Sequence, residues 1–183
     1  MTTQAPWFPC HAITFEHALE DVQALVAGFL EIRPDASWLL LAFDAAASER
    51  HLWTAWLAMR RGYADGSAIS RNADAEFLRL LSGTHQIRIG FERAGLASGD
   101  ERAWLLRLPE TMDDGVLPTT EWRAFSTESQ PMINMLGARL MPNRPEPTLA
   151  GLNRLCIEYH EQGANTSGEK LFLGHIIAAQ TSA

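Results

Sequence analysis

The fold of the chain is decided by residues 71–96, which read RNADAEFLRLLSGTHQIRIGFERAGL. Apolar residues recur at three- and four-residue spacing on both sides of a Ser82–Gly83 break, which predicts two short helices over 73–81 and 86–94. No set of side chains in this stretch is typical of catalysis.

The ends of these two helices have recognisable signals. Asn72 is a plausible cap for the first helix. Gly95 is expected to end the second in the left-handed conformation that glycine adopts most readily. The spacing of Ile87, Phe91 and Ala94 predicts that they form the buried face of the second helix.

Strands and further helices are predicted on both sides of this stretch. The expected strands are 11–15, 38–43 and 103–108, and the expected helices are 19–30 and 48–62, with Ser48 as a cap. The run WLLLAF at 38–43 is continuously apolar, which suits a central strand covered on both faces. The alternation predicts an α/β (α+β) fold with a small mixed β-sheet flanked by helices, in a single domain over 1–183.

The C-terminal part of the sequence is less regular. Residues 110–147 form a divergent, proline-containing region in which we expect loops and one irregular helix near 131–139. Thr148 is predicted to cap a clear helix that ends before Gly163. The last apolar segment is strand-like around 175–178.

Composition and charge limit the classes of partner. The 183 residues have a formal net charge of −7, so no global field attracts nucleic acid or an anionic membrane, and any RNA contact must be local. Cys10 and Cys156 lie far apart and outside any metal-binding spacing. Because no export signal or membrane-spanning run is recognisable, we expect a cytoplasmic protein without membrane contact.

Two motifs suggest chemistry, and both have a simpler interpretation. The segment GANTSGEKL at 163–171 nearly matches a phosphate-binding loop, but Glu169 places a carboxylate before Lys170, and the preceding element is predicted to be a helix, not a strand. Cys156 and His160 have a helical i, i+4 spacing but lack a second pair of ligands. We therefore expect no catalytic residue, no metal and no cofactor, so the chain is not predicted to be an enzyme.

Basic residues gather between positions 60 and 93. This region holds Arg60, Arg61, Arg71, Arg79, Arg88, Arg93 and His85 against Asp65, Asp74, Glu76 and Glu92. A locally positive patch can position a phosphate backbone. It can equally be a solvated helical face with ordinary salt bridges, and spacing alone slightly favours this second interpretation.

The sequence around the Ser-Gly break resembles a known family. Glu76, Arg79, Ser82–Gly83 and Gln86–Ile87 match the signature of the smallest, kinase-binding subunit of the KEOPS complex, the PRPK-binding protein family. The resemblance covers about residues 37–108. It implies a compact α/β protein without an active site. Such a protein docks on the small atypical kinase of a complex that makes threonylcarbamoyl-adenosine in tRNA.

The resemblance also implies site residues. In archaeal relatives this subunit grips the single-stranded CCA end of tRNA, which implies KEOPS-type kinase and tRNA as direct partners and other KEOPS subunits as indirect ones. The residues expected to bind RNA are Arg79, Ser82, Gly83, His85 and Gln86 from the resemblance, together with Arg61 and Arg71 from the locally positive region. Ile87 and Phe91 are expected to bind the protein partner. His85 stands where relatives often have arginine, and this change weakens a phosphate contact at neutral pH.

Two alternatives remain open from the sequence. A protein of the same fold could serve as an interaction module in an unrelated complex, which the acidic charge and the divergent C-terminal region favour. An enzyme that uses the near match to a phosphate loop is the other alternative, and stabilisation by nucleotides would support it.

Overall fold

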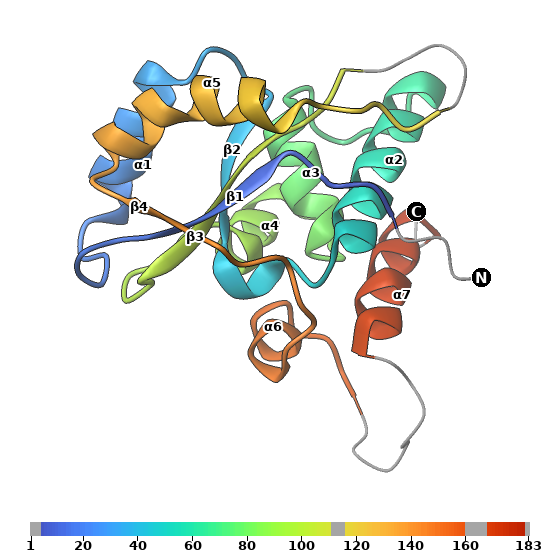
Figure 1. The fold of residues 1–183 in the computed structure, drawn as a ribbon. Coiled ribbons are helices and arrows are strands. Elements are labelled where there is room, and N and C mark those ends of the chain that lie inside the picture. Colours follow the sequence, from blue (N-terminus) through green and yellow to red (C-terminus); the bar gives the residue numbers. More distant parts are fainter. Residues whose placement is uncertain (1–4, 111–115, 160–167, 182–183) are drawn as a thin grey trace.

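A four-stranded sheet organises the described part of the protein, and helices lie on both of its faces (Figure 1). The computed structural model describes residues 5–110, 116–159 and 168–181. In chain order the elements are β1 (Cys10–Thr14), α1 (Val22–Ile32), β2 (Trp38–Ala42), the 3-10 turn η1 (Phe43–Ala45), α2 (Glu49–Asp65), α3 (Ala73–Leu81), α4 (Ile87–Ala94), β3 (Arg102–Arg107), α5 (Trp122–Met135), β4 (Arg139–Met141), α6 (Leu149–Arg154) and α7 (Gly168–Thr181).

The sheet confirms the α+β class and corrects two details of it. Its strand order is β2-β3-β1-β4, and every neighbouring pair is antiparallel, so the sheet is not mixed. β2 was expected in the middle of the sheet but lies at an edge, because β3 inserts between β1 and β2. The short strand β4 was not predicted.

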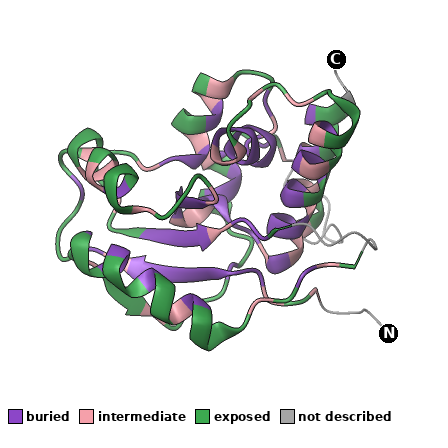
Figure 2. Ribbon diagram, turned by 90° about the horizontal axis from the view of Figure 1, so that it is seen from above, coloured by how far each residue is buried: buried purple, intermediate pink, exposed green. Residues whose placement is uncertain are grey.

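Alternation along β2 explains its continuous apolar sequence. Trp38 and Leu40 belong to the cluster on one face of the sheet, where α1 and α5 pack, and Trp38 stacks on Phe125 of α5 with ring centroids 5.2 Å apart. Leu39 and Leu41 belong to the cluster on the other face, with α2 and α3. Both faces of this edge strand are thus buried, as Figure 2 shows for the sheet.

The central helices follow their sequence signals closely. α3 has the predicted bounds, and the Ser48 hydroxyl accepts a hydrogen bond from the His51 N–H at the start of α2. α2 continues past its predicted end at Gly62 and stops only at Gly66, which has a φ of +77°. The left-handed conformation expected at Gly95 is wrong, since its φ is −72°. Gly95 is instead constrained by space, because a Cβ there would overlap the carbonyl oxygen of Phe91.

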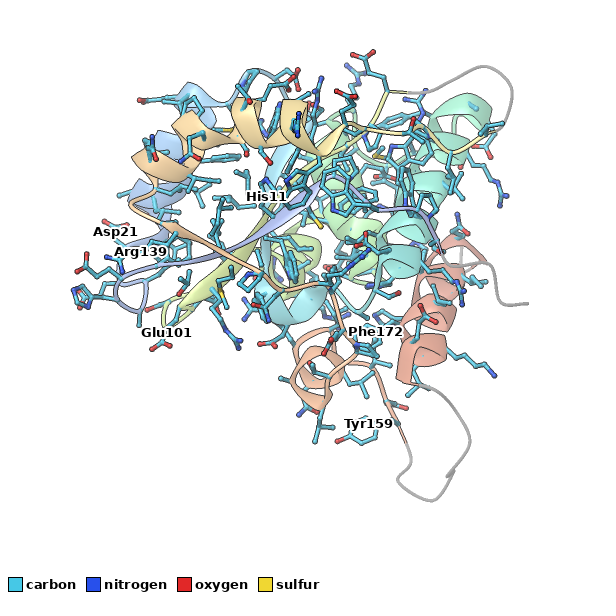
Figure 3. All side chains as sticks on the ribbon, viewed as in Figure 1. His11, Asp21, Glu101, Arg139, Tyr159 and Phe172 are labelled. Carbon is cyan, nitrogen blue, oxygen red and sulfur yellow. The ribbon has the colours of Figure 1, made fainter. Side chains whose placement is uncertain are left out.

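The final segment is a helix and not the strand expected around residues 175–178. In α7 the buried residues Phe172, Ile176 and Ala179 recur at four- and three-residue spacing, and the helix packs on α2 and α3. Figure 3 shows Phe172 on the side of α7 that faces α6. α6 itself ends at Arg154, well before the predicted end.

The structure also shows where other features of the sequence lie. Trp53 and Trp56 of α2 are 2% and 4% exposed and belong to the core. The irregular helix expected near 131–139 overlaps α5, which begins earlier, at Trp122, contains Pro131 and ends at Met135, before the strand β4. No helix within the described ranges is long and apolar enough to cross a membrane.

Acidic pH is expected to destabilise the fold through His51. This side chain is fully buried, its Nδ1 accepts a hydrogen bond from Ala47 N–H, and its Nε2 has no hydrogen-bond partner. Burial, assisted by the nearby His175, lowers the pKa of His51 from its ordinary value to about 3. At mildly acidic pH the unfolded chain therefore binds more protons than the folded chain. The stability that the neutral His51 contributes is fully present above its pKa in the unfolded state, and it is lost as the pH falls toward its pKa in the folded state.

The expected loss between about pH 7.5 and pH 5 is about 2 kcal/mol of unfolding free energy for this one group. Urea denaturation at the two pH values measures it. His51→Asn keeps an acceptor for the Ala47 N–H and should reduce the loss of stability between these pH values by about this amount. The matched variant at an exposed histidine, His17→Asn, should leave it unchanged. Identical pH profiles for His51→Asn and the native chain would contradict the prediction.

Candidate functional site

A buried ion pair lies at the centre of the stretch 71–96. The side chains of Arg79 and Glu76, one turn apart on α3, are 5% and 1% exposed. Nε and Nη2 of Arg79 donate to the two carboxylate oxygens of Glu76 over 3.0 and 2.5 Å, and its Nη1 donates to the carbonyl oxygen of Thr84 over 2.8 Å. Glu76 also accepts from the N–H of Ser70 over 2.9 Å. The pair thereby ties the segments before and after α3 to the same helix.

Hydrogen bonds keep this pair ionised. Burial alone would raise the pKa of Glu76, but hydrogen bonds from Arg79 and from the backbone at Ser70 and Ile69 outweigh burial, so that its pKa lies below its ordinary value. Two opposite charges with satisfied hydrogen bonds are the arrangement in which buried ions are tolerated. The pair acts as a rigid support for the turn after α3.

The turn after α3 is built on two close contacts. Gly83 has a φ of +62°, and a Cβ there would overlap the imidazole ring of His175, whose Nε2–H donates to the Ser82 carbonyl oxygen over 2.8 Å. The Ser82 hydroxyl donates to the carbonyl oxygen of Gly90 over 3.1 Å. A Cβ at Gly90 would lie 2.8 Å from the Cα of Arg79, so α3 and α4 approach each other where α4 has no side chain.

A polar pocket opens beside this turn. His85 and Gln86 are exposed at the turn, and the pocket next to them has a volume of about 280 Å³. The polar side chains that line it are Arg61, Asp65, Ser67, Glu76, Arg79, His85 and Gln180. Segments from α2, α3, the 82–86 turn and α7 thus meet at one place.

The predicted RNA-binding residues divide into three groups. Arg61, Arg79 and His85 line the same pocket. Arg71 and Gln86 are exposed but do not line it, and Ser82 and Gly83 lie in the turn beneath. Four of the seven residues predicted to bind RNA therefore lie in the turn at 82–86, but these four have different roles.

Arg79 and Ser82 are not available as direct RNA contacts in this structure. The Ser82 side chain is fully buried, and the Arg79 guanidinium donates to Glu76 and Thr84 inside the protein. Both residues were expected to contact RNA directly. In the structure they support the turn instead. An acidic residue three positions before an arginine on a helix is spaced for side-chain contact, and here the two residues form an ion pair.

The positive region is also less free than its composition suggested. Arg88 and Glu92 form an exposed i, i+4 ion pair on α4. Arg93 donates to the Ser82 carbonyl oxygen over 3.2 Å. Asp65 and Glu76 line the pocket together with the basic residues. Arg61 and His85 are thus the exposed basic groups of the pocket wall.

The two residues predicted to bind a partner lie outside this pocket. Phe91 was expected to be buried but is 45% exposed, and Ile87 is half-buried. Phe91 borders an apolar groove of about 140 Å³. The apolar residues along this groove are Val26, Phe29, Leu30, Leu39, Leu40, Leu78, Phe91 and Leu96. The groove follows the edge strand β2 between α1, α3 and α4.

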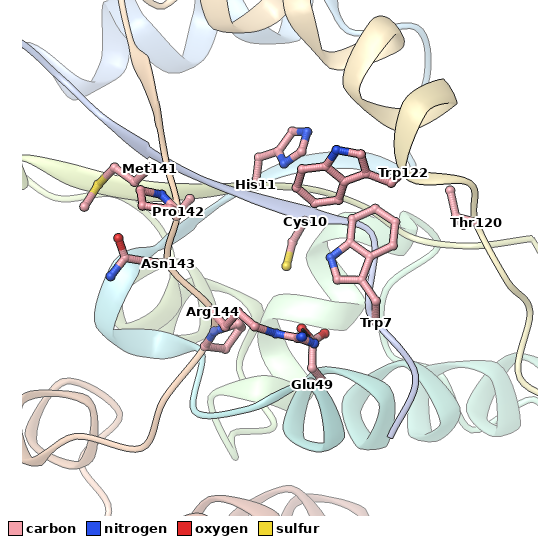
Figure 4. A pocket seen from close by; sticks show the side chains of 12 residues that line it. Trp7, Cys10, His11, Glu49, Thr120, Trp122, Met141, Pro142, Asn143 and Arg144 are labelled. Atoms are coloured by element: carbon pink, nitrogen blue, oxygen red, sulfur yellow. Dashed lines mark hydrogen bonds and ion pairs between the residues drawn. The ribbon is translucent and has the colours of Figure 1, made fainter. Parts of the chain in front are cut away.

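A larger cavity, of about 550 Å³, was not predicted from the sequence (Figure 4). It lies beside β1, between the indole rings of Trp7 and Trp122 on one side and the segment after β4 on the other. Glu49 is at its lower end in the figure, where its carboxylate accepts from Arg144 over 2.9 Å and from the N–H of Phe8 over 2.6 Å. Its walls come from segments more than a hundred residues apart, so no local pattern could have indicated it.

Titratable groups around this cavity are held neutral or shifted by burial. Burial raises the pKa of the Cys10 thiol well above its ordinary value, and the charge of Glu49 adds to the effect. Burial lowers the pKa of His11 to about 4, and its Nε2 lies 3.1 Å from the Ser126 hydroxyl. Burial raises the pKa of Glu49 despite its two hydrogen bonds. The Cys10 thiol is therefore not activated as a nucleophile.

The other chemical motifs remain without support. Within the described ranges no group of three histidine, cysteine or carboxylate side chains is placed to hold a metal ion. His160 and residues 163–167 of the near phosphate loop lie outside those ranges. Glu169, the residue that breaks this motif, accepts a hydrogen bond from Arg50 over 3.1 Å.

No model of a protein family matches the chain, and a search of curated proteins finds no match either.

Proposed function

We propose that this chain is a noncatalytic subunit of a KEOPS-like complex that modifies tRNA. In this role it binds the small kinase of the complex and helps to recruit tRNA by its 3′ CCA end. The observation that carries the proposal is the exposed pair His85–Gln86, held on the buried Glu76–Arg79 ion pair beside Arg61.

The chemistry of the turn supports single-strand RNA binding. Proteins bind unpaired bases by stacking and by hydrogen bonds to base edges, which an imidazole ring and a carboxamide can provide. Arg61 adds a guanidinium suited to phosphate. The acidic groups nearby and the net charge of −7 disfavour nonspecific binding, so affinity must come from these few side chains.

The groove beside Phe91 supports the kinase-docking part of the proposal. Phe91 and Leu30 are 45% and 47% exposed, and neighbouring exposed apolar residues are typical of protein interfaces. The ion pair between Arg33 and Asp74, at 2.6 Å, adds a polar boundary to the groove. An apolar centre with a polar rim is the usual anatomy of a protein-binding surface.

Removal of the His85 and Gln86 side chains is expected to weaken binding of intact tRNA about tenfold, because one stacking contact and one base-edge hydrogen bond are lost. Fluorescence anisotropy with intact tRNA and with tRNA trimmed of its CCA end, over a salt series, measures this. Arg61→Ala should lower the slope of log affinity against log salt by about one.

Arg88→Ala is the matched control, because Arg88 is exposed on α4 and does not line the pocket. It should leave the preference for intact tRNA unchanged. Equal binding of intact and trimmed tRNA, or binding of neither, would refute end recognition. The second candidate would then be favoured: a module of the same fold that binds a protein in an unrelated complex through the groove beside Phe91.

A further inference from the structure

β4 separates from β1 after Met141 and leaves part of the β1 edge open. The pairing ends at Ala12 and Met141, and the next residue, Pro142, has no N–H with which to continue it. The Pro9 carbonyl oxygen accepts a hydrogen bond from β3 over 3.0 Å. Backbone groups of successive strand residues point to opposite edges. The N–H and C=O of Cys10 therefore point away from β3, toward the cavity of Figure 4.

Two indole rings form an aromatic wall beside this open edge. Trp7 and Trp122 contact each other with ring centroids 5.1 Å apart, and both line the cavity. Trp122 is 55% exposed, although it is the largest type of apolar side chain. His11 supports it from behind through an edge contact at 4.5 Å. An exposed aromatic surface that is fixed in position suits a planar ring.

The polar end of the cavity offers a donor and an acceptor together. The Glu49 side chain is 10% exposed and the Arg144 side chain is 58% exposed. The carboxylate oxygens each accept one hydrogen bond, from Arg144 and from the N–H of Phe8, and each has a further lone pair. Because the carboxylate disfavours a second anion, this end suits neutral hydroxyl groups better than phosphate.

We propose that this cavity binds a ribonucleoside. The base lies against Trp7 and Trp122, its hydrogen-bonding edge meets the backbone N–H and C=O of Cys10, and the ribose hydroxyls reach Glu49 and Arg144. The volume of about 550 Å³ is sufficient for such a ligand, since small-molecule sites commonly measure about 300–1,000 Å³. The residues of this site are separate from those of the turn at 82–86.

Isothermal titration of the full chain with adenosine, guanosine, cytidine and uridine tests the site. Saturable binding is expected, and purines should bind more tightly than pyrimidines because they stack over a larger area. Trp122→Ala should weaken adenosine binding about tenfold. 2′-Deoxyadenosine should bind about fivefold more weakly than adenosine, because it lacks one hydroxyl for the polar end.

Matched variants separate this site from the fold and from tRNA binding. Leu140→Ala changes an exposed residue of β4 next to the cavity and should leave adenosine binding unchanged, as should Gln86→Ala. Circular dichroism checks that Trp122→Ala is folded. If none of the four nucleosides shows saturable binding at millimolar concentration, the proposal is overturned. Unchanged affinity in both Trp122→Ala and Arg144→Ala would also overturn it.

Discussion

Replacement of Arg79 by alanine is expected to lower the free energy of unfolding by about 3–5 kcal/mol, because removal of one member of a buried ion pair leaves the other charge uncompensated. Glu76 would remain 1% exposed without its main partner, and the Thr84 carbonyl oxygen would lose its donor. Urea denaturation of the native chain and the variant measures the loss. A loss below about 1 kcal/mol, the range of exposed ion pairs, would contradict the burial of this pair.

Two further variants separate the pair from its surroundings. Arg88→Ala breaks the exposed ion pair with Glu92 and is expected to cost less than about 1 kcal/mol. Glu76→Leu combined with Arg79→Met replaces both charges by apolar groups and should recover part of the loss. The recovery should be incomplete, because the Ser70 N–H and the Thr84 carbonyl oxygen depend on the pair for hydrogen bonds.

The buried position of Arg79 changes how RNA-binding variants must be interpreted. If Arg79→Ala weakens tRNA binding, the loss can arise from release of the turn that carries His85 and Gln86, without any contact between the guanidinium and RNA. The exposed side chains give the direct test. A variant of Arg79 therefore reports on the support of the site, and variants of His85 and Gln86 report on the site itself.

Local sequence signals predicted the elements well where local contacts decide them. The bounds of α3 and the Ser48 cap follow from spacing and capping chemistry within a few residues. The edge position of β2 depends on where β3 inserts, sixty residues later, and its apolar sequence looks the same in either position because both faces are covered. The helical state of α7 is decided by packing on α2 and α3.

The candidate site, too, could be predicted from local sequence signals only in part. The Ser-Gly and Gln-Ile pairs indicated the turn, but a sequence does not show whether an arginine points outward or donates to a glutamate one turn earlier, and Arg79 does the latter. The aromatic cavity was not predicted because Trp7 and Trp122 come together only when β1 and α5 meet. Long-range contacts form such sites, and periodicity contains no information about them.

Gly83→Ala is the second substitution with a large expected effect, a loss of about 3 kcal/mol of unfolding free energy. A left-handed backbone conformation at a residue with a Cβ contributes about 1–2 kcal/mol. Overpacking against the imidazole of His175 contributes a similar amount. The substitution should also reduce tRNA binding, because the ring of His175 holds the Ser82 carbonyl oxygen at the base of the turn. Chemical denaturation of the variant and the native chain measures the first effect.

Two comparisons separate backbone strain from the clash at Gly83. Gly66 also has a left-handed backbone, with a φ of +77°, but nothing lies within 4 Å of a Cβ placed there. Gly66→Ala should therefore show the strain alone, about 1–2 kcal/mol. In a His175→Ala background, Gly83→Ala should cost no more than Gly66→Ala, because the ring that it would overlap is gone. If Gly83→Ala costs equally much with and without His175, the imidazole does not pack on the turn, and the contact between α7 and the site is refuted.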